Sequence, residues 1–270
     1  MLPPRGVLLA STDVHGDLRD FVALEAVFRE ELAAEPETHW VILGDVVHAP
    51  DARARADRPD LYDFDDGSMA IVDAILRLRS EQPGKVHFVL GNHDHGHVGG
   101  PHTRKFHDDE VDALERGLTE GERSRMHALF ASALLAVAAP CGVLLCHGSP
   151  DDALVSLRAL DDVPLELGAL SPEQARVLQT ILTSYGQPDA TCRRMLEGLS
   201  RELGFPLRVV VHGHDRDEAG WFREGAHQVC PVLFGAPRAH KRYVRLDLGA
   251  RYDGAAALRD GIELRRLFPS

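Results

Sequence analysis

Five short polar motifs hold the residues of this chain that could do chemistry. They read Asp13-Val14-His15-Gly16, Gly44-Asp45, Gly91-Asn92-His93-Asp94, His147-Gly148 and Gly213-His214-Asp215. Carboxylates, imidazoles and one amide oxygen form a mixed nitrogen and oxygen donor set, which suits Mn, Fe or Zn and not Ca. One tetrahedral ion cannot use so many donors, so the set favours two divalent metal ions that share a carboxylate. Such a pair is the standard clamp for attack on a phosphate.

Each motif directly follows a short apolar run that predicts a β-strand. The predicted strands span 6–11, 40–43, 86–90, 143–146, 208–211, 231–234 and 243–248, and the first five of them precede the motifs. Ligands gather beyond the carboxyl ends of strands in open α/β sheets. We therefore expect the five motifs to meet at one place in the fold.

Apolar residues at helical spacing predict the helices that connect these strands. The predicted helices span 18–34, 68–79, 122–137, 171–183 and 190–203. Alternating strands and helices in the front half indicate an α/β fold, whereas closely spaced strands in the back half are typical of hairpins. Residues 49–67, rich in Asp and Arg, are expected to form a long loop. We expect one domain over 1–270, with 151–207 as a helical insertion or cap beside the site.

The bulk composition is that of a globular protein and excludes several functions. Of 270 residues, 44% are hydrophobic and 27% are charged. The net charge of −12 argues against nucleic-acid binding by bulk electrostatics. No apolar run is long enough to span a membrane, and the N-terminus does not read as a signal peptide. The four Cys residues are far apart, so we expect no disulfide framework and a cytoplasmic location.

The order of the five motifs resembles the calcineurin-like metallophosphoesterase superfamily, from Asp13 to about Pro237. This resemblance implies an α/β/β/α sandwich of two mixed sheets flanked by helices. The sequence is most similar to the serine/threonine phosphoprotein phosphatase branch. The features shared with that branch are Asp17-Leu18 after the first motif, Gly220-Trp221-Phe222, Leu233-Phe234-Gly235-Ala236-Pro237, and Arg216 where other members often have a second metal-binding His.

The same resemblance implies roles for individual residues and two metal ions, for which Mn, Fe or Zn are the candidates. A metal-bridging hydroxide would attack phosphorus in line, and an imidazole would protonate the leaving alkoxide. The implied roles are Asp13 and His15 on the first metal, Asp45 bridging, Asn92, His147 and His214 on the second metal, and His93 as the general acid.

The second motif departs from the phosphatase branch, which typically reads Gly-Asp-x-Val-Asp-Arg-Gly. This chain has His48 where the branch has the Asp that orients the catalytic His, and Ala49 where it has the Arg that grips the phosphate. His48 could itself be a donor near the phosphate. The other candidates for these tasks are the carboxylates Asp63, Asp65 and Asp66 and the cations Arg53, Arg55, Arg58 and Arg104.

Three functions remain open at this point. The first is a phosphomonoesterase of the protein phosphatase type, acting on phosphoserine or phosphothreonine. The second keeps the metal chemistry but acts on nucleotides, dinucleoside polyphosphates or other small phosphoesters. The third is a metal-binding module without activity, against which the intact Asn92-His93 pair argues. His95 and His97 are expected on the loop surface beside the site.

Overall fold

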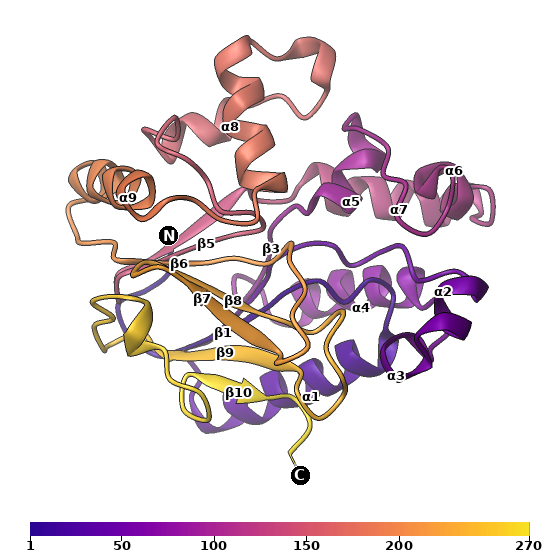
Figure 1. The fold of residues 1–270 in the computed structure, drawn as a ribbon, viewed down its shortest axis with the longest axis horizontal. Helices are drawn as coiled ribbons and strands as arrows, with labels where there is room; N and C mark the ends of the chain where they lie inside the picture. The colour runs from indigo at the N-terminus through magenta and orange to yellow at the C-terminus, as the bar shows by residue number, and fades with distance from the viewer. Residues whose placement is uncertain (270) are drawn as a thin grey trace.

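Short runs of aliphatic residues form two mixed sheets in this computed structural model, which describes residues 1–269 (Figure 1). The strand order of the first sheet is β10-β9-β1-β2-β3. Strands β1, β2 and β3 run parallel, whereas β9 is antiparallel to both β1 and β10. Its strands are β1 (Val7–Ser11), β2 (Thr38–Ile42), β3 (Val86–Phe88), β9 (Arg242–Asp247) and β10 (Leu264–Arg266).

The second sheet has the strand order β4-β5-β6-β8-β7. Strands β5, β6 and β8 run parallel, and antiparallel β4 and β7 form its two edges. Its strands are β4 (Ala136–Ala139), β5 (Val143–Cys146), β6 (Val209–Val211), β7 (Trp221–Glu224) and β8 (Gln228–Pro231). The predicted pair of mixed sheets is confirmed.

Alternating side chains of the strands divide the core into two layers. In β1, Leu8 and Ala10 join a buried cluster with residues of β5 and β6, so this cluster lies between the sheets. Leu9 belongs to the other large cluster, which contains Phe21 and Phe28 of the first long helix. Strand β1 thus packs on the opposite sheet with one face and on helices with the other.

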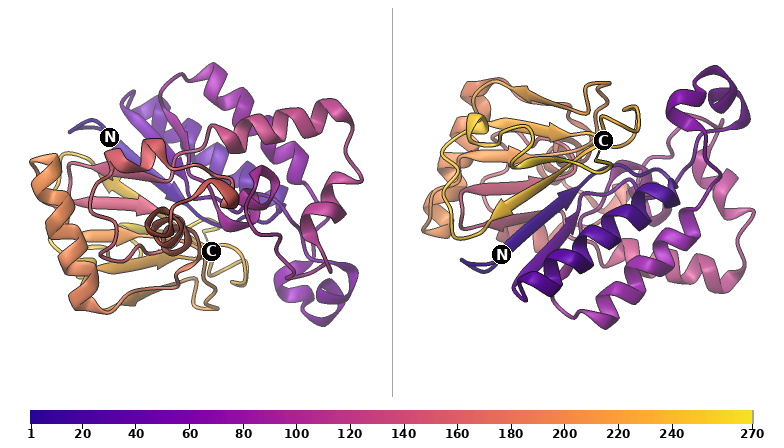
Figure 2. Two further views of the ribbon diagram at one scale, coloured as in Figure 1. Left: turned by 90° about the horizontal axis from the view of Figure 1, so that it is seen from above. Right: turned by 90° about the horizontal axis from the view of Figure 1, so that it is seen from below.

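Long amphipathic helices cover the outer faces of both sheets. In Figure 2 the indigo and purple helices of the first part of the chain and the orange helix lie on opposite sides of the sheets. Helices α1 (Leu18–Ala34) and α4 (Ser68–Glu81) contact the first sheet, and α7 (Glu120–Ala131) packs on α4. Helices α8 (Pro172–Thr183) and α9 (Asp189–Leu203) supply apolar residues to a cluster shared with β5 and β6.

Several predicted elements differ from the observed ones. The expected loop 49–67 contains two short helices, α2 (Ala52–Asp57) and α3 (Pro59–Tyr62). Asp51 caps the first of them, and Pro59 begins the second. The predicted helix 122–137 ends at Ala131, because residues 136–139 pair with β5 as β4. The strand expected at 231–234 lies at 228–231 instead.

The remaining helical segments are short. They are α5 (Asn92–His95) and α6 (Glu110–Glu115), with 3-10 turns at Gly96–Val98, Arg158–Asp162, Leu167–Ala169 and Ala255–Ala257. Among residues 1–269, no helix has the length and apolar character required to cross a bilayer.

Candidate active site

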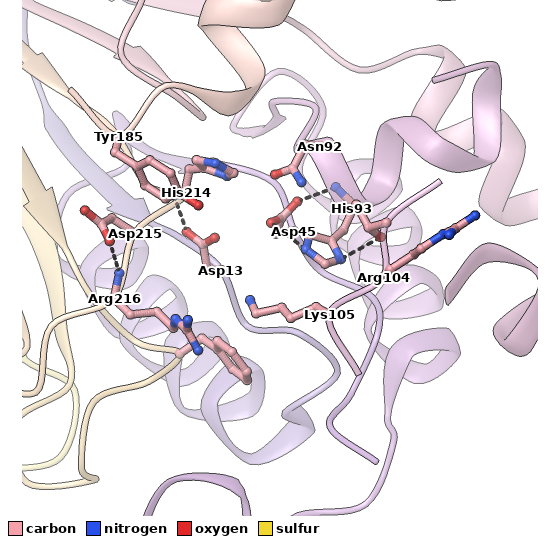
Figure 3. A pocket seen from close by; sticks show the side chains of 12 residues that line it. Asp13, Asp45, Asn92, His93, Arg104, Lys105, Tyr185, His214, Asp215 and Arg216 are labelled. Carbon is pink, nitrogen blue, oxygen red and sulfur yellow. Dashed lines mark hydrogen bonds and ion pairs between the residues drawn. The ribbon is translucent and has the colours of Figure 1, made fainter. Parts of the chain in front are cut away.

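All five motifs meet beyond the carboxyl ends of β1, β2, β3, β5 and β6, at the edge where both sheets present these ends. A cavity of about 560 Å³ opens there. Figure 3 shows the carboxylates and imidazoles on its wall facing one another across the opening. The predicted site residues that line it are Asp13, Asp45, Asn92, His93 and His214. The other two, His15 and His147, are buried directly behind Asp45.

Asp45 lies at the centre of the site. Its Oδ2 is 3.6 Å from His15 Nε2 and 3.5 Å from His147 Nε2. Its Oδ1 accepts a hydrogen bond of 2.9 Å from the backbone N–H of His93. Burial raises the pKa of Asp45 well above its usual value, and the carboxyls of Asp13 and Asp94 add to this effect. A bound cation would supply the positive charge that the buried anion lacks.

Two clusters of donor atoms share Asp45. His15, Asp45 and His93 form one cluster, and Asp45, His147 and His214 form the other, with donor atoms within 4.8 Å of one another in each. Asn92 Oδ1 lies 3.0 Å from His147 Nε2 and extends the second cluster. This arrangement fits a pair of divalent ions on either side of one carboxylate.

Backbone carbonyls set the orientation of two of these imidazoles. His15 Nδ1 lies 3.1 Å from the carbonyl of Val47, and His147 Nδ1 lies 2.6 Å from that of Leu43. A carbonyl oxygen only accepts, so each Nδ1 carries the proton and each Nε2 keeps its lone pair. Both Nε2 atoms face Asp45. Imidazoles that bind a metal through one nitrogen commonly donate the N–H of the other to a carbonyl in this way.

His214 lies on the opposite wall of the cavity. Its backbone N–H donates a 3.0 Å hydrogen bond to Asp13 Oδ2, which joins the ends of β6 and β1. Its ring stacks on Tyr185, with 4.6 Å between the ring centroids. Burial lowers the pKa of His214 to about 2, so its ring is neutral and can offer a lone pair to a metal.

Strained backbone marks the same region. Among the described residues, five that are not glycine have a positive φ, between 30° and 71°. Left-handed backbone costs such residues free energy and concentrates at functional sites. The five are Asp13, His15, Asp45, His48 and His214, of which four are predicted site residues.

The carboxylate expected beside His93 comes from an unexpected element. Glu110, the first residue of α6, places Oε2 3.1 Å from His93 Nδ1. Two of the three candidate carboxylates have other partners: Asp65 pairs with Arg55 at 2.8 Å, and Asp66 accepts from Ser68 at 2.5 Å. Among sequence signals, only the position of Glu110 soon after the third motif could have pointed to it.

Three cationic side chains line the cavity, namely Arg104, Lys105 and Arg216. Of the four predicted cations, only Arg104 lines the cavity. The other three, Arg53, Arg55 and Arg58, pair with acidic residues near α2 and α3 or on a neighbouring loop. Lys105 Nζ lies 3.1 Å from His15 Nε2 and 4.5 Å from the centre of the Phe234 ring. The cavity therefore presents positive charge beside the predicted metal ligands.

His48, His95 and His97 are buried, so the expectation of surface positions for His95 and His97 is wrong. His48 bridges two other imidazoles: its Nδ1 lies 3.1 Å from His93 Nδ1, and its Nε2 lies 2.9 Å from His97 Nε2. It lies behind His93 and is not among the residues that line the cavity.

The fold of two mixed sheets between helices, with an Asp and His cluster at the strand ends, is that of a metallophosphoesterase. The calcineurin-like phosphoesterase family matches residues 7–216, so the chain belongs to this family. Its members use divalent metal ions to hydrolyse phosphoesters, and the donor set described above fits that use.

Solved structures support the fold. A serine/threonine phosphatase from Saccharomyces cerevisiae, described as similar to human phosphatase PP5, superimposes with a TM-score of 0.60 and 13% identity. The match covers 91% of this chain and 74% of the yeast chain. A cold-active protein tyrosine phosphatase superimposes with a TM-score of 0.53 and 14% identity, covering 92% of this chain and 76% of the other. No curated protein matches the chain significantly in sequence.

Proposed function

We propose that this chain is a two-metal phosphomonoesterase that removes phosphate from phosphoserine or phosphothreonine side chains of proteins. The observation that carries the proposal is the position of Asp45, one carboxylate shared by two clusters of donor atoms beside an open cavity. When bound, two divalent ions would activate a water molecule and neutralise the phosphoryl oxygens. Mn, Fe and Zn suit the donor set.

In this proposal the side chains divide the work. The residues that would hold the metal ions are Asp13, His15, Asp45, Asn92, His147 and His214. His93 would donate a proton from Nε2 to the leaving alkoxide, since this nitrogen is on the side of the ring toward Asp45, 4.0 Å from Oδ2. Arg104, Lys105 and Arg216 would bind the phosphate, the task of the family Arg that Ala49 replaces.

One observation favours the second substrate class. Tyr185 stacks on His214 at the rim of the cavity, and 60% of its surface is exposed. An exposed ring beside a phosphate site could stack on a nucleobase. Nucleotides and dinucleoside polyphosphates are therefore the alternative substrates to be tested.

The test is a substrate panel on purified protein with Mn²⁺, combined with metal analysis. We expect two metal ions per chain and a higher kcat/KM for phosphoserine or phosphothreonine peptides than for diadenosine tetraphosphate. The reverse order would support the alternative substrates. His93→Ala should lower kcat by about 10²- to 10⁴-fold, and the exposed His240→Ala should have no effect. Failure of the wild-type chain to hydrolyse any phosphoester would favour an inactive metal-binding module.

A further inference from the structure

The Nδ1 side of His93 faces away from the cavity into a buried polar cluster. Three atoms lie at 3.1 Å from this nitrogen: Glu110 Oε2, His48 Nδ1 and Thr103 Oγ1. Glu110 and His48 are both buried. Since His93 Nε2 faces Asp45 on the other side of the ring, the group that binds Nδ1 decides how the ring is oriented.

Glu110 is the charged member of this cluster. Burial raises the pKa of Glu110, but the neighbouring His93 and Thr103 outweigh this and lower it to about 2. Burial lowers the pKa of His48 to about 2 as well, with the nearby His93 and His97 adding to the effect. At neutral pH the cluster therefore contains a carboxylate anion and a neutral His48, and the anion is the stronger acceptor for an imidazole N–H.

Backbone hydrogen bonds hold Glu110 in place. Its own N–H donates to the carbonyl of Thr103 at 3.1 Å, and its Oε1 accepts from the N–H of Phe106 at 3.0 Å. These two bonds close residues 103–110 into a loop. Oε2 has no hydrogen-bond partner among the described residues, and it lies at ion-pair distance, 3.1 Å, from His93 Nδ1. One oxygen thus fixes the carboxylate, and the other faces His93.

We propose that Glu110 is a positioning residue for His93: its carboxylate holds the proton on Nδ1 and turns Nε2 toward the leaving group. The imidazolium form then gives its Nε2 proton to the alkoxide and is left as the neutral ring with its proton on Nδ1. This inference rests on the proposed role of His93 as general acid. In the phosphatase branch that orienting task is assigned to an Asp in the second motif, where this chain has His48. Here the carboxylate comes from Glu110 on α6. Because a neutral His48 stands where the branch has its Asp, Glu110 has no second carboxylate beside it at this position.

A competing explanation is a further cation site, because His48, His93 and Glu110 have donor atoms within 4.8 Å of one another. In that case His93 Nδ1 would be a metal ligand and would carry no proton. The two explanations differ in the number of metal ions per chain and in the protonated nitrogen of His93, and both quantities can be measured.

The variant Glu110→Gln keeps the shape of the side chain and removes its charge. Asp112→Asn, an exposed carboxyl on the same helix, is the matched control. We expect Glu110→Gln to lower kcat for a phosphoserine peptide at least about tenfold more than kcat for 4-nitrophenyl phosphate, because a good leaving group departs without a proton. KM and the metal content should not change, and Asp112→Asn should match the wild type. An equal loss of kcat for both substrates, or loss of one metal ion per chain, would overturn the proposal.

Imidazole ¹⁵N NMR supplies a readout that does not depend on activity. The neutral form of His93 should carry its proton on Nδ1 in the wild-type chain, and this tautomer should become mixed in Glu110→Gln. An unchanged tautomer in the variant would refute the positioning role even if the chain hydrolyses no phosphoester. Conversely, a changed tautomer in a chain without activity would leave Glu110 as the residue that orients His93 and would reject only the proposed function.

Discussion

The carboxylate of Asp94 holds Asp45 in position from behind. Asp94 Oδ2 accepts the backbone N–H of Asp45 at 2.7 Å and that of Gly91 at 3.0 Å, and Oδ1 accepts Val46 N–H at 3.1 Å. The loops after β2 and β3 are thereby tied together at the residue that both donor clusters share. Asp94 has no place on the cavity wall, yet it sets the position of the central carboxylate.

Replacing Asp94 with Asn should therefore weaken metal binding and stability together. An amide has one acceptor oxygen, and its NH₂ group would face a backbone N–H. We expect a loss of about 1–3 kcal/mol in the free energy of unfolding and weaker binding of Mn²⁺. Urea unfolding and calorimetric titration measure the two effects. Wild-type affinity for Mn²⁺ in this variant would contradict the supporting role.

Gly91 permits the close approach of the same two loops. A Cβ at this position would lie 2.3 Å from the backbone nitrogen of Asp45 and 2.2 Å from its Oδ1. Gly91→Ala should consequently displace Asp45 and lower both Tm and metal content. Gly168→Ala, where a Cβ would meet nothing within 4 Å, is the control and should behave as the wild type.

Lys105 should act mainly on phosphate binding. Its ammonium group faces the cavity beside His15, and a metal ion on His15 Nε2 would take the lone pair to which Lys105 now donates. The ammonium is then free to meet a phosphoryl oxygen. Lys105→Ala should raise KM and the inhibition constant of inorganic phosphate about tenfold, with a smaller change in kcat. Steady-state kinetics test this, with Lys85→Ala on the surface as control.

Removal of metal should abolish activity and lower stability. The two donor clusters place several buried side chains around Asp45, and ions that bind only the folded state stabilise it. Dialysis against a chelator should lower Tm, and added Mn²⁺ should restore both Tm and hydrolysis. In Asp45→Asn the shared ligand is lost, so both ions should bind weakly. An unchanged metal content in that variant would refute the two-metal assignment.

Stability should depend on pH through Asp20, which lies on α1 and pairs with Lys241. Burial raises the pKa of Asp20 from 3.8 to about 6, so between these values the folded state holds a proton that the unfolded state has lost. Stability contributed in this way is present below about pH 4 and is lost as pH rises through about 6. The free energy of unfolding of the wild type, relative to Asp20→Asn, should fall by on the order of 3 kcal/mol across this window. The exposed Asp57→Asn should show no such trend.

The sequence was informative where chemistry follows directly from local structure. Strand, glycine and donor residues are neighbours in the chain, so the sequence alone predicts that the ends of β1, β2, β3, β5 and β6 lie together. Helix α1 was predicted with both ends correct, because its apolar residues repeat at helical spacing, and the structure adds Asp17 as its N-cap.

Glu110 and Lys105 could not be predicted in this way. They lie in a segment without a strand-end motif, and only the packing of that segment over α5 brings Glu110 to His93 and Lys105 to His15. Strand β4 was missed for a related reason. Its first two residues fall at the end of the predicted helix 122–137, and the pairing of β4 with β5 depends on a contact that local sequence does not encode.

The place of β9 in the first sheet has a consequence for how the chain folds during synthesis. Strand β1 is hydrogen-bonded on one edge to β2 and on the other to β9, which lies far later in the chain. Until residues 242–247 leave the ribosome, the strand that precedes Asp13 and His15 has an open edge. Such long-range pairing slows folding and exposes a strand to aggregation. The first motif therefore gains the support of a fully paired strand only after β9 has been made.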